Sequence, residues 1–371
     1  MSHPSIAIVG AGPAGLTAAR ILQRHGWRAA VFEADASPDA RDQGGTLDLH
    51  ADAGQRALAR AGLLDAFLAC ARHEDQDTLV LDHRTAATLA AERPAPGEGR
   101  RPEIDRKVLR DLLLDALAPD TVRWGHRLRD IGLDPDGRRR LHFDGQPSQA
   151  FDLVVGADGA WSRVRRALTG VQPDDTGIVF VELRIDDVDT QHPRLARLVG
   201  RGTMFALHGG QGLIAQRNGG GQLRIYAALP AAAPAGITRA WLLERFTGWA
   251  PALLALVTQA DAIAAVRPIV ALPPGTGWPS AMGLTLVGDA AHVMPPVGVG
   301  VNLAMLDAAD LAEALVAAPD WRRAVQDFER AMLARAGAVA EEARLGFAAM
   351  FGPDAPRALL EHMGMDARAA A

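Results

Sequence analysis

Three glycines and one glutamate near the start of the sequence have types and spacing suited to holding phosphate and hydroxyl groups. Gly10, Gly12 and Gly15 follow the apolar run of residues 6–9, and Glu33 ends the next apolar run. Gly10 allows a sharp turn, Gly12 has no side chain to block a pyrophosphate, and Gly15 lets a helix lie close to the sheet. Glu33 stands 23 positions after Gly10, close to the interval of roughly 20 residues at which a carboxylate meets a ribose hydroxyl. The pattern predicts a dinucleotide-binding turn; an ordinary loop between a strand and a helix is the alternative.

A strand, a helix and a second strand must position these residues. Pro13 fits the first turn of a helix, where its missing N–H is not needed, and Gly26 fits a left-handed helix end. The helix between them is expected to have about a dozen residues. The second strand is expected from about Arg28 to Glu33.

A second polar turn follows the apolar run of residues 153–155. It contains Asp158 and Gly159, and Ser162 stands just before residues that are expected to form a helix. Asp158 could serve the bound dinucleotide. Alternatively, Asp158 and Ser162 could simply cap the helix, since both residue types are preferred at helix N-termini.

A third turn places Gly288 and Asp289 directly after the apolar run of residues 284–287. An acid after a strand-ending glycine lies at the carboxyl edge of the sheet, where cofactors bind, and a polyol such as ribitol would satisfy its carboxylate. Residues 295–302 then supply unobstructed amides before a helix, whose N-terminus can stabilise negative charge on a reduced ring. We interpret His292 as a structural histidine, with a role as general base as the alternative.

Composition limits the size and class of the protein. The chain has 371 residues, 49% of them hydrophobic, which favours two domains around a shared cleft. A net charge of −5 without a dense Lys/Arg stretch argues against a nucleic-acid surface. Cys70 is the only cysteine, so neither an intrachain disulfide nor a thiolate metal cluster can form. No uncharged apolar stretch approaches the roughly 20 residues of a membrane span, so we expect no membrane partner. Together with the charge and the single cysteine, this leads us to expect a cytoplasmic protein without a metal or a nucleic-acid partner.

The pattern along the chain indicates an α/β part interrupted by a β-rich part. Residues 178–229 alternate between apolar and polar side chains, which is typical of an antiparallel sheet. Residues 284–287 and 301–317 then resume the α/β part, and residues 320–351 have the spacing of an amphipathic helix capped by Asp320. The expected limits are residues 1–70, 95–174 and 273–318 for the first domain, 71–94 and 175–272 for the β-rich domain, and 319–371 for the C-terminal helix.

The three turns in this order resemble those of the flavoprotein aromatic hydroxylases with a para-hydroxybenzoate hydroxylase-like fold, over nearly the whole chain. Within that family the chain is similar to the tetracycline-inactivating FAD monooxygenases. Residues 44–50 (GGTLDLH), 102–106 (PEIDR), 288–296 (GDAAHVMPP) and 300–302 (GVN) carry this similarity. The resemblance implies an α/β fold in which a Rossmann-like FAD-binding domain contains an inserted antiparallel β-sheet substrate domain and is followed by a long C-terminal helix.

The resemblance also implies FAD as the cofactor. It places Glu33 on the adenosine ribose, Arg106 and Asp289 along the ribityl-pyrophosphate, and the amides of residues 300–302 at the pyrimidine edge of the flavin. The full set of cofactor residues that it implies is Gly10, Gly12, Ala14, Gly15, Glu33, Gly45, Asp48, Arg106, Asp158, Gly288, Asp289, Pro296, Gly300, Val301 and Asn302.

Glu182, Phe205, Arg224 and Pro296 are the candidates for contact with the substrate. The tetracycline-inactivating relatives hold their ligand with a glutamine, an arginine and a histidine, whereas here Glu182 stands at the glutamine and Arg224 at the histidine. Because an unpaired buried charge is costly, this exchange should reject the ligand pattern of those relatives. Glu182 and Arg224 could instead only pair with each other across a sheet surface.

The activity implied by the resemblance is a monooxygenase reaction on an aromatic or polycyclic, polyketide-like small molecule. NAD(P)H reduces the flavin, O₂ adds at its C4a carbon, and the resulting hydroperoxide hydroxylates the substrate. The alternatives are an FAD oxidase or dehydrogenase that consumes no NAD(P)H, a non-catalytic FAD- or ligand-binding protein and, as a weaker fit, an NAD-dependent dehydrogenase. The long C-terminal helix favours a monomer that is braced across its domains.

Overall fold

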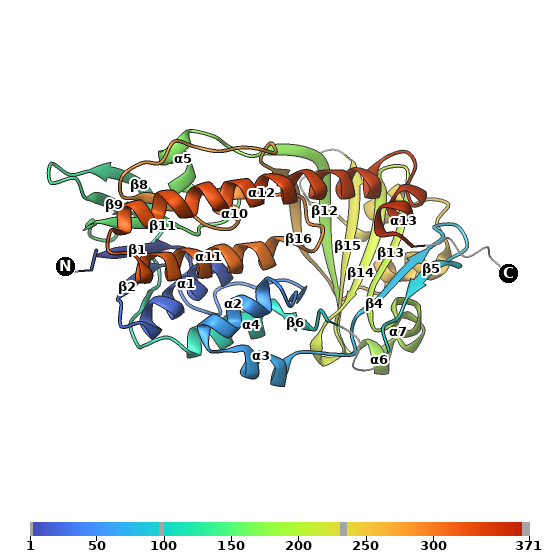
Figure 1. The fold of residues 1–371 in the computed structure, drawn as a ribbon. Helices are drawn as coiled ribbons and strands as arrows, with labels where there is room; N and C mark the ends of the chain where they lie inside the picture. Colours follow the sequence, from blue (N-terminus) through green and yellow to red (C-terminus); the bar gives the residue numbers. More distant parts are fainter. Residues whose placement is uncertain (1–2, 96–99, 231–235, 366–371) are drawn as a thin grey trace.

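The computed structural model describes residues 3–95, 100–230 and 236–365 and contains two large sheets joined by a long helix (Figure 1). One half is built on a five-stranded parallel sheet. Its strands, in spatial order, are β17 (Leu284–Leu286), β11 (Leu153–Gly156), β1 (Ile6–Val9), β2 (Ala29–Phe32) and β7 (Val122–Arg123). Because these strands are parallel, the three polar turns that follow β1, β11 and β17 meet at one edge of the sheet.

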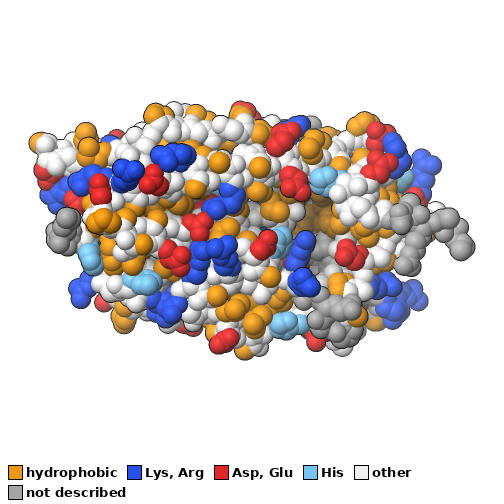
Figure 2. All heavy atoms as spheres, viewed as in Figure 1, with side chains coloured by type: hydrophobic (Ala, Val, Ile, Leu, Met, Phe, Trp, Pro, Cys, Tyr) orange, Lys and Arg blue, Asp and Glu red, His pale blue; other side chains and the backbone are white. Residues whose placement is uncertain are grey.

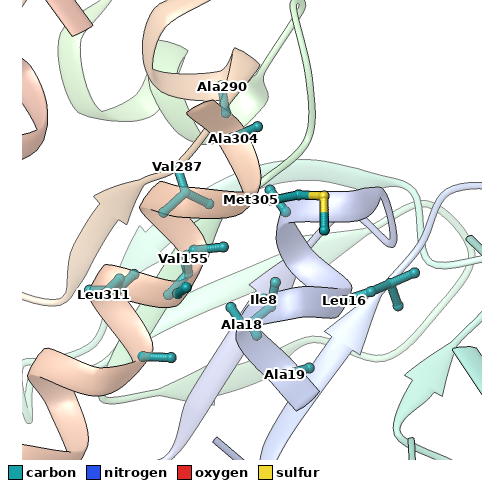
Figure 3. Close-up of a cluster of buried hydrophobic side chains, with 14 of the residues drawn as sticks. Ile8, Leu16, Ala18, Ala19, Val155, Val287, Ala290, Ala304, Met305 and Leu311 are labelled. Carbon is teal, nitrogen blue, oxygen red and sulfur yellow. The ribbon is translucent and has the colours of Figure 1, made fainter. Parts of the chain in front are cut away.

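Helices pack on this sheet through a shared apolar core. Those of this half are α1 (Pro13–Arg24), α2 (Gly54–Ala61), α3 (Leu64–Cys70), α4 (Arg106–Asp115), α5 (Arg163–Thr169), α10 (Asp289–His292) and α11 (Gly300–Ala317). α1 lies against α11, and Ile8, Leu16, Val155, Val287 and Met305 gather between these helices and the sheet (Figure 3). Two small sheets complete this half: β3 (Thr46–Asp48) with β6 (Glu103–Asp105), and β8 (Leu128–Leu133) with β9 (Arg139–Phe143) and β10 (Gln149–Phe151).

The other half is a seven-stranded sheet. Its strands, in spatial order, are β16 (Ala262–Ala271), β12 (Asp174–Ile185), β15 (Leu223–Pro230), β14 (Gln211–Arg217), β13 (Gly202–His208), β4 (Asp77–Leu81) and β5 (Thr88–Glu92). The predicted antiparallel pairing holds except that β13 and β4 are parallel, because β4 enters from the first half of the chain and not through a hairpin. A short helix, η1 (Gly219–Gly221), links β14 to β15. One face has its own apolar core under α6 (Val188–Gln191), α7 (Pro193–Val199), α8 (Arg239–Arg245) and α9 (Pro251–Thr258).

The long helix α12 (Trp321–Phe351) crosses both halves (Figure 1). Its 31 residues correspond to a length of about 46 Å. Phe328 lies in the core of the parallel-sheet half, whereas Phe347 lies against the open face of the seven-stranded sheet, where α13 (Arg357–Met363) also packs. Asp320 accepts a backbone N–H at 3.0 Å and caps the helix, as predicted.

The local predictions for the first half are confirmed. The helix after the glycine-rich turn has 12 residues and is followed by Gly26 with a φ of +77°. Gly62, whose φ of +71° is left-handed, separates α2 from α3. Among the residues that the structure describes, no helix is both long and apolar enough to span a membrane.

Candidate functional site

The glycine-rich turn lies between β1 and α1, at the edge where the parallel strands end. A side chain on Gly10 would overlap the carbonyl of Ala157 in the neighbouring turn, and one on Gly15 would overlap the carbonyl of Gly10. Gly10 also has a φ of +106°, where residues with a Cβ are strained. By contrast, within the described part of the chain no atom beyond its neighbours lies within 4 Å of a Cβ placed on Gly12. The open space therefore lies where the sequence predicts a pyrophosphate.

Glu33 lies beside this turn. Its carboxylate accepts the Ala11 N–H at 2.7 Å and the Asp35 N–H at 2.9 Å. The buried Arg110 guanidinium supports the turn by donating to the carbonyls of Ala11 at 3.1 Å and Pro38 at 3.0 Å. Sequence reasoning missed Arg110, because an arginine in an amphipathic helix is ordinarily a surface residue.

Asp158 and Ser162 in the second turn cap α5. Ser162 Oγ accepts the Arg165 N–H at 2.8 Å. Asp158 accepts the Arg163 N–H at 2.7 Å and the Ser162 hydroxyl at 2.5 Å. Burial raises the pKa of Asp158, although these donors favour its charged form. The contacts are those of the capping interpretation, and a contact between Asp158 and a cofactor stays a prediction.

The third turn, at Gly288, lies between helices α1 and α11. A Cβ on Gly288 would come within 2.7 Å of Ala304 on α11 and 3.5 Å of Ala14 on α1. Asp289 is exposed, and no described residue donates a hydrogen bond to its carboxylate. One of its oxygens lies 3.9 Å from a Cβ placed on Gly300. Asp289 is thus an available acceptor between the third turn and the start of α11.

Arg165 joins the second and third turns, and sequence reasoning missed it. The side chain is fully buried, and its guanidinium donates to the carbonyls of Asp289 at 3.2 Å, Ala290 at 3.0 Å and Ala160 at 2.5 Å. It stands in a short run of arginines, and the local pattern does not indicate which of them is buried.

His292 belongs to a buried ionic cluster. Its Nε2 lies 2.5 Å from one oxygen of Asp307, and Arg335 donates to the other oxygen at 2.9 Å. Asp307 also accepts the Gly288 N–H at 3.4 Å. Burial tends to lower the pKa of His292, but the hydrogen bond and charge of Asp307 outweigh it, so the pKa is raised. These contacts support the structural interpretation of His292.

Asn302 connects two segments that contain predicted cofactor residues. Its Oδ1 accepts the His50 N–H at 2.8 Å, and its Nδ2 donates to the Asp48 carbonyl at 2.9 Å. The Asp48 carboxylate lies 3.0 Å from the His50 ring and 3.8 Å from a Cβ placed on Gly298. The sequence predicted a role only for the backbone amide of Asn302, since the partner of its side chain is 252 positions away.

The open face of the seven-stranded sheet presents three rows of side chains, which we call the sheet wall. Phe205, Ile214, Tyr226 and Glu182 stand opposite one another on adjoining strands and therefore share one face. The adjacent rows of the same face are Thr203, Gln216, Arg224 and Arg184 on one side, and Leu207, Gly212, Ala228 and Phe180 on the other. The wall is consequently polar at one end and apolar at the other.

The turn at Gly45 lies against the polar end of the sheet wall. A Cβ on Gly45 would lie 2.5 Å from Tyr226 Oη and 3.4 Å from Gln216 Oε1. It would lie 3.7 Å from Arg224 Cγ. The Gly45 carbonyl accepts the N–H of Arg106, whose side chain is exposed. The structure thus brings two predicted cofactor residues to a predicted substrate residue, together with Tyr226, which sequence reasoning missed.

The remaining predicted substrate residues occupy different environments. Glu182 and Arg224 are both buried and form an ion pair of 3.0 Å. Phe205 is half-buried, and Pro296 is exposed in the loop before α11, with Val301 half-buried behind it. Figure 2 shows a hollow on one face of the molecule, between the half that carries α2 and α11 and the half that carries the seven-stranded sheet.

Glu103 is a buried carboxyl on β6, opposite Asp48 on β3. Thr46 Oγ1 lies 2.5 Å from its Oε2. Burial raises its pKa to about 8, and the nearby Asp48 charge adds to the effect, while Thr46 and Arg72 oppose it. The group is therefore largely protonated at neutral pH.

We expect Glu103→Gln to stabilise the protein increasingly as the pH rises. Between the ordinary pKa of 4.5 and the folded value of about 8, the folded state retains a proton that the unfolded state has released. The free energy of unfolding therefore falls by up to about 1.4 kcal/mol per pH unit in this window. Glutamine is neutral and keeps an acceptor for Thr46, so urea unfolding across the window should show a variant-minus-wild-type difference that grows with pH. The exposed Glu92→Gln change is the control, and a constant difference for Glu103→Gln would contradict the raised pKa.

Comparisons with known proteins identify relatives along almost the whole chain. A family model described as an FAD binding domain matches residues 4–229 and 281–329. Monooxygenase asqM of Emericella nidulans is 31% identical over 373 aligned residues, covering 84% of this chain and 83% of that protein. The crystal structure of Klebsiella pneumoniae HpxO complexed with FAD and uric acid matches with a TM-score of 0.81 and 23% identity, over 97% of this chain and 92% of that one. Tetracycline destructase Tet(51) matches with a TM-score of 0.73 and 18% identity, over 98% and 95% of the two chains. The two structural matches establish the fold.

Proposed function

Because the chain belongs to the FAD binding domain family, and within it to the FAD-dependent monooxygenases of the aromatic hydroxylase type, we propose that it is a single-component hydroxylase that consumes NAD(P)H. One atom of O₂ enters an aromatic or polycyclic, polyketide-like small molecule, the other leaves as water, and NAD(P)H supplies the two electrons. The observation that carries the proposal is the contact of the Gly45 turn with the polar end of the sheet wall. A site at this contact would place a flavin ring and a substrate side by side.

The residues at the sheet edge fit FAD. The open space at Gly12 faces the N-terminus of α1, whose amides favour phosphate. Glu33 lies beside this turn with lone pairs to spare for a ribose hydroxyl. Asp289, which no described residue hydrogen-bonds, would accept from the ribityl hydroxyls, and the exposed Arg106 would pair with the pyrophosphate.

The side chains of the site bind and orient, and they exclude water. When bound, FAD supplies the electron transfer and oxygen activation that protein side chains cannot provide. Arg165 and Asp307 hydrogen-bond the backbone of the third turn, which fixes the backbone position of Asp289. The apolar end of the sheet wall, with Phe180 and the neighbouring Phe351 on α12, would shield the substrate from water.

We expect the purified, FAD-loaded protein to oxidise NADPH or NADH faster in the presence of a substrate from a panel of phenols, anthraquinones and tetracyclines. Mass spectrometry should show one added oxygen, and this oxygen should carry the label when ¹⁸O₂ is supplied. Tetracyclines belong in the panel because of the resemblance, although the Glu182 and Arg224 exchange argues against them. Stimulated NAD(P)H oxidation without a gain in product mass would mean uncoupling.

The same assay separates the alternatives. An oxidase or dehydrogenase would convert its substrate under air without NAD(P)H and without label from ¹⁸O₂. A sequestering protein would bind a panel compound tightly and turn over none. Protein that stays colourless after incubation with FAD would favour the NAD-dependent dehydrogenase.

We further propose the domain limits, the oligomeric state and the location given by the sequence. Residues 71–94 and 175–272 would form the substrate domain, inserted into an FAD-binding domain of residues 1–70, 95–174 and 273–318. Residues 319–371 would brace the two within a cytoplasmic monomer, since α12 packs both in the core of the parallel-sheet half and against the open face of the seven-stranded sheet. Light scattering of the purified protein tests the monomer.

A further inference from the structure

Arg224 in the sheet wall lies between two carboxylates that differ in how firmly they are held. Its Nη1 donates to Glu182 at 3.0 Å and its Nη2 to Asp42 at 2.6 Å. The side chains of Arg224 and Glu182 are 5% and 3% exposed, whereas that of Asp42 is 48% exposed. Glu182 is thus a fixed partner in the sheet, and Asp42 reaches Arg224 from the solvent side.

Asp42 has no other attachment to the sheet among the residues described. It stands in the loop between β2 and β3, and its second hydrogen bond is to the N–H of Gly44 in the same loop, at 2.9 Å. Burial tends to raise its pKa, but the Gly44 N–H and Arg224 outweigh this effect and lower it. A loop carboxylate with these partners can leave Arg224 without disturbing the sheet.

The charges of the cluster favour a second anion at Arg224. Glu182 serves two arginines, since Arg267 also contacts it, at 3.2 Å. Arg184, the other cation near Asp42, has its own partner in Asp186 at 3.2 Å. If Asp42 leaves, the buried Arg224 keeps only Glu182, which it shares with Arg267, whose side chain is 52% exposed. Because an incompletely compensated charge on a buried guanidinium is costly, another anion at the position of Asp42 is favoured.

The neighbours of Arg224 suit an aromatic molecule. Tyr226 is the next residue on the same face of β15, and Phe180 and Phe205 follow toward the apolar end of the wall. The hollow in Figure 2 is bordered by both basic and acidic side chains. A ligand that lies along the wall would therefore place rings over the apolar end and a polar group at Arg224.

We propose that the substrate carries an anionic oxygen group, a carboxylate or an ionised phenol or enol, which displaces Asp42 from Arg224. This inference rests on the proposed function, because it assigns the substrate class of that site. Before the substrate binds, Asp42 occupies the position of this anionic group and neutralises Arg224. Arg224 determines specificity through the positive charge that Glu182 does not fully compensate, since Glu182 also pairs with Arg267.

Calorimetric titration of the FAD-loaded protein, without reductant, tests the exchange. The probes are a hydroxynaphthoic acid and its carboxamide, which have the same shape and differ in charge. The wild type should bind the acid at least about tenfold more tightly than the amide, since charge-assisted hydrogen bonds are stronger than neutral ones. Asp42→Asn should tighten binding of the acid by about three- to tenfold and leave the amide unchanged, because it removes the competing carboxylate.

Asp39→Asn is the matched control, since Asp39 lies in the same loop but pairs with Lys107, at 2.9 Å. It should change neither affinity, and Arg224→Gln should abolish the preference for the acid. The proposal is overturned if the wild type binds neither probe or both equally, or if Asp42→Asn weakens both, as a purely structural Asp42 would. Flavin absorbance of the same samples and the turnover assay above report on the proposed function separately, because this titration requires no turnover.

Discussion

Asp307→Ala is expected to lower the free energy of unfolding by about 3–5 kcal/mol. Asp307 is fully buried and is the common acceptor of His292, Arg335 and the Gly288 N–H. Its removal leaves a buried imidazole and part of a guanidinium without a countercharge. Urea unfolding, followed by circular dichroism, measures the loss.

Two further variants control for this prediction. Asp307→Asn keeps the shape and an acceptor and should lose less than alanine does. Asp310→Ala removes a partner of both Arg335 and Arg60, but the Asp310 side chain is 28% exposed whereas that of Asp307 is fully buried, so it should cost less than Asp307→Ala. Equal small losses for Asp307→Ala and Asp310→Ala would show that the buried cluster contributes little to stability.

Asp289→Ala is expected to lose bound flavin, whereas Arg224→Ala is expected to keep it. Asp289 is exposed and accepts no hydrogen bond from the described residues, so its removal should change stability by no more than about 0.5 kcal/mol. A charged acceptor of a cofactor hydroxyl contributes about 1.5–3 kcal/mol, which corresponds to a roughly ten- to hundredfold weaker affinity for FAD. Equilibrium dialysis and the ratio of flavin to protein absorbance measure this change.

Arg224→Ala is the comparison variant, because Arg224 lies on the sheet wall and is a predicted substrate residue. Glu182 retains Arg267 in this variant, so the sheet should still fold and flavin content should match the wild type. Only the response to the substrate should change. Equal flavin content in the two variants would refute this division between cofactor and substrate residues.

Several features of the fold were predictable because their causes are local. The turn at Gly10, the helix that begins at Pro13 and its left-handed end at Gly26 follow from backbone sterics within a few residues. The apolar spacing of residues 320–351 also predicted α12, because helical periodicity alone determines which side chains share a face. The parallel pairing of β13 with β4 was not predictable in this way, since it depends on where the chain enters the sheet.

The roles of the buried polar residues were decided by the tertiary structure. Arg110, Arg165 and Asp307 look in the sequence like ordinary helical residues, and their partners are carbonyls and charges in distant segments. The sequence left open whether Glu182 and Arg224 pair or contact a ligand; the structure shows the pair and adds Asp42, which is 182 positions from Arg224.

By itself, the sequence determined that this chain folds as a dinucleotide-binding α/β protein with a β-rich insertion, because glycine turns, caps and periodicities act over a few residues. Tertiary structure alone decided that the Gly45 turn meets the sheet wall and that Arg224 stands between a buried and an exposed carboxylate. Such contacts depend on which strands become neighbours, and hydrogen bonds between side chains hundreds of positions apart leave no pattern in the local sequence.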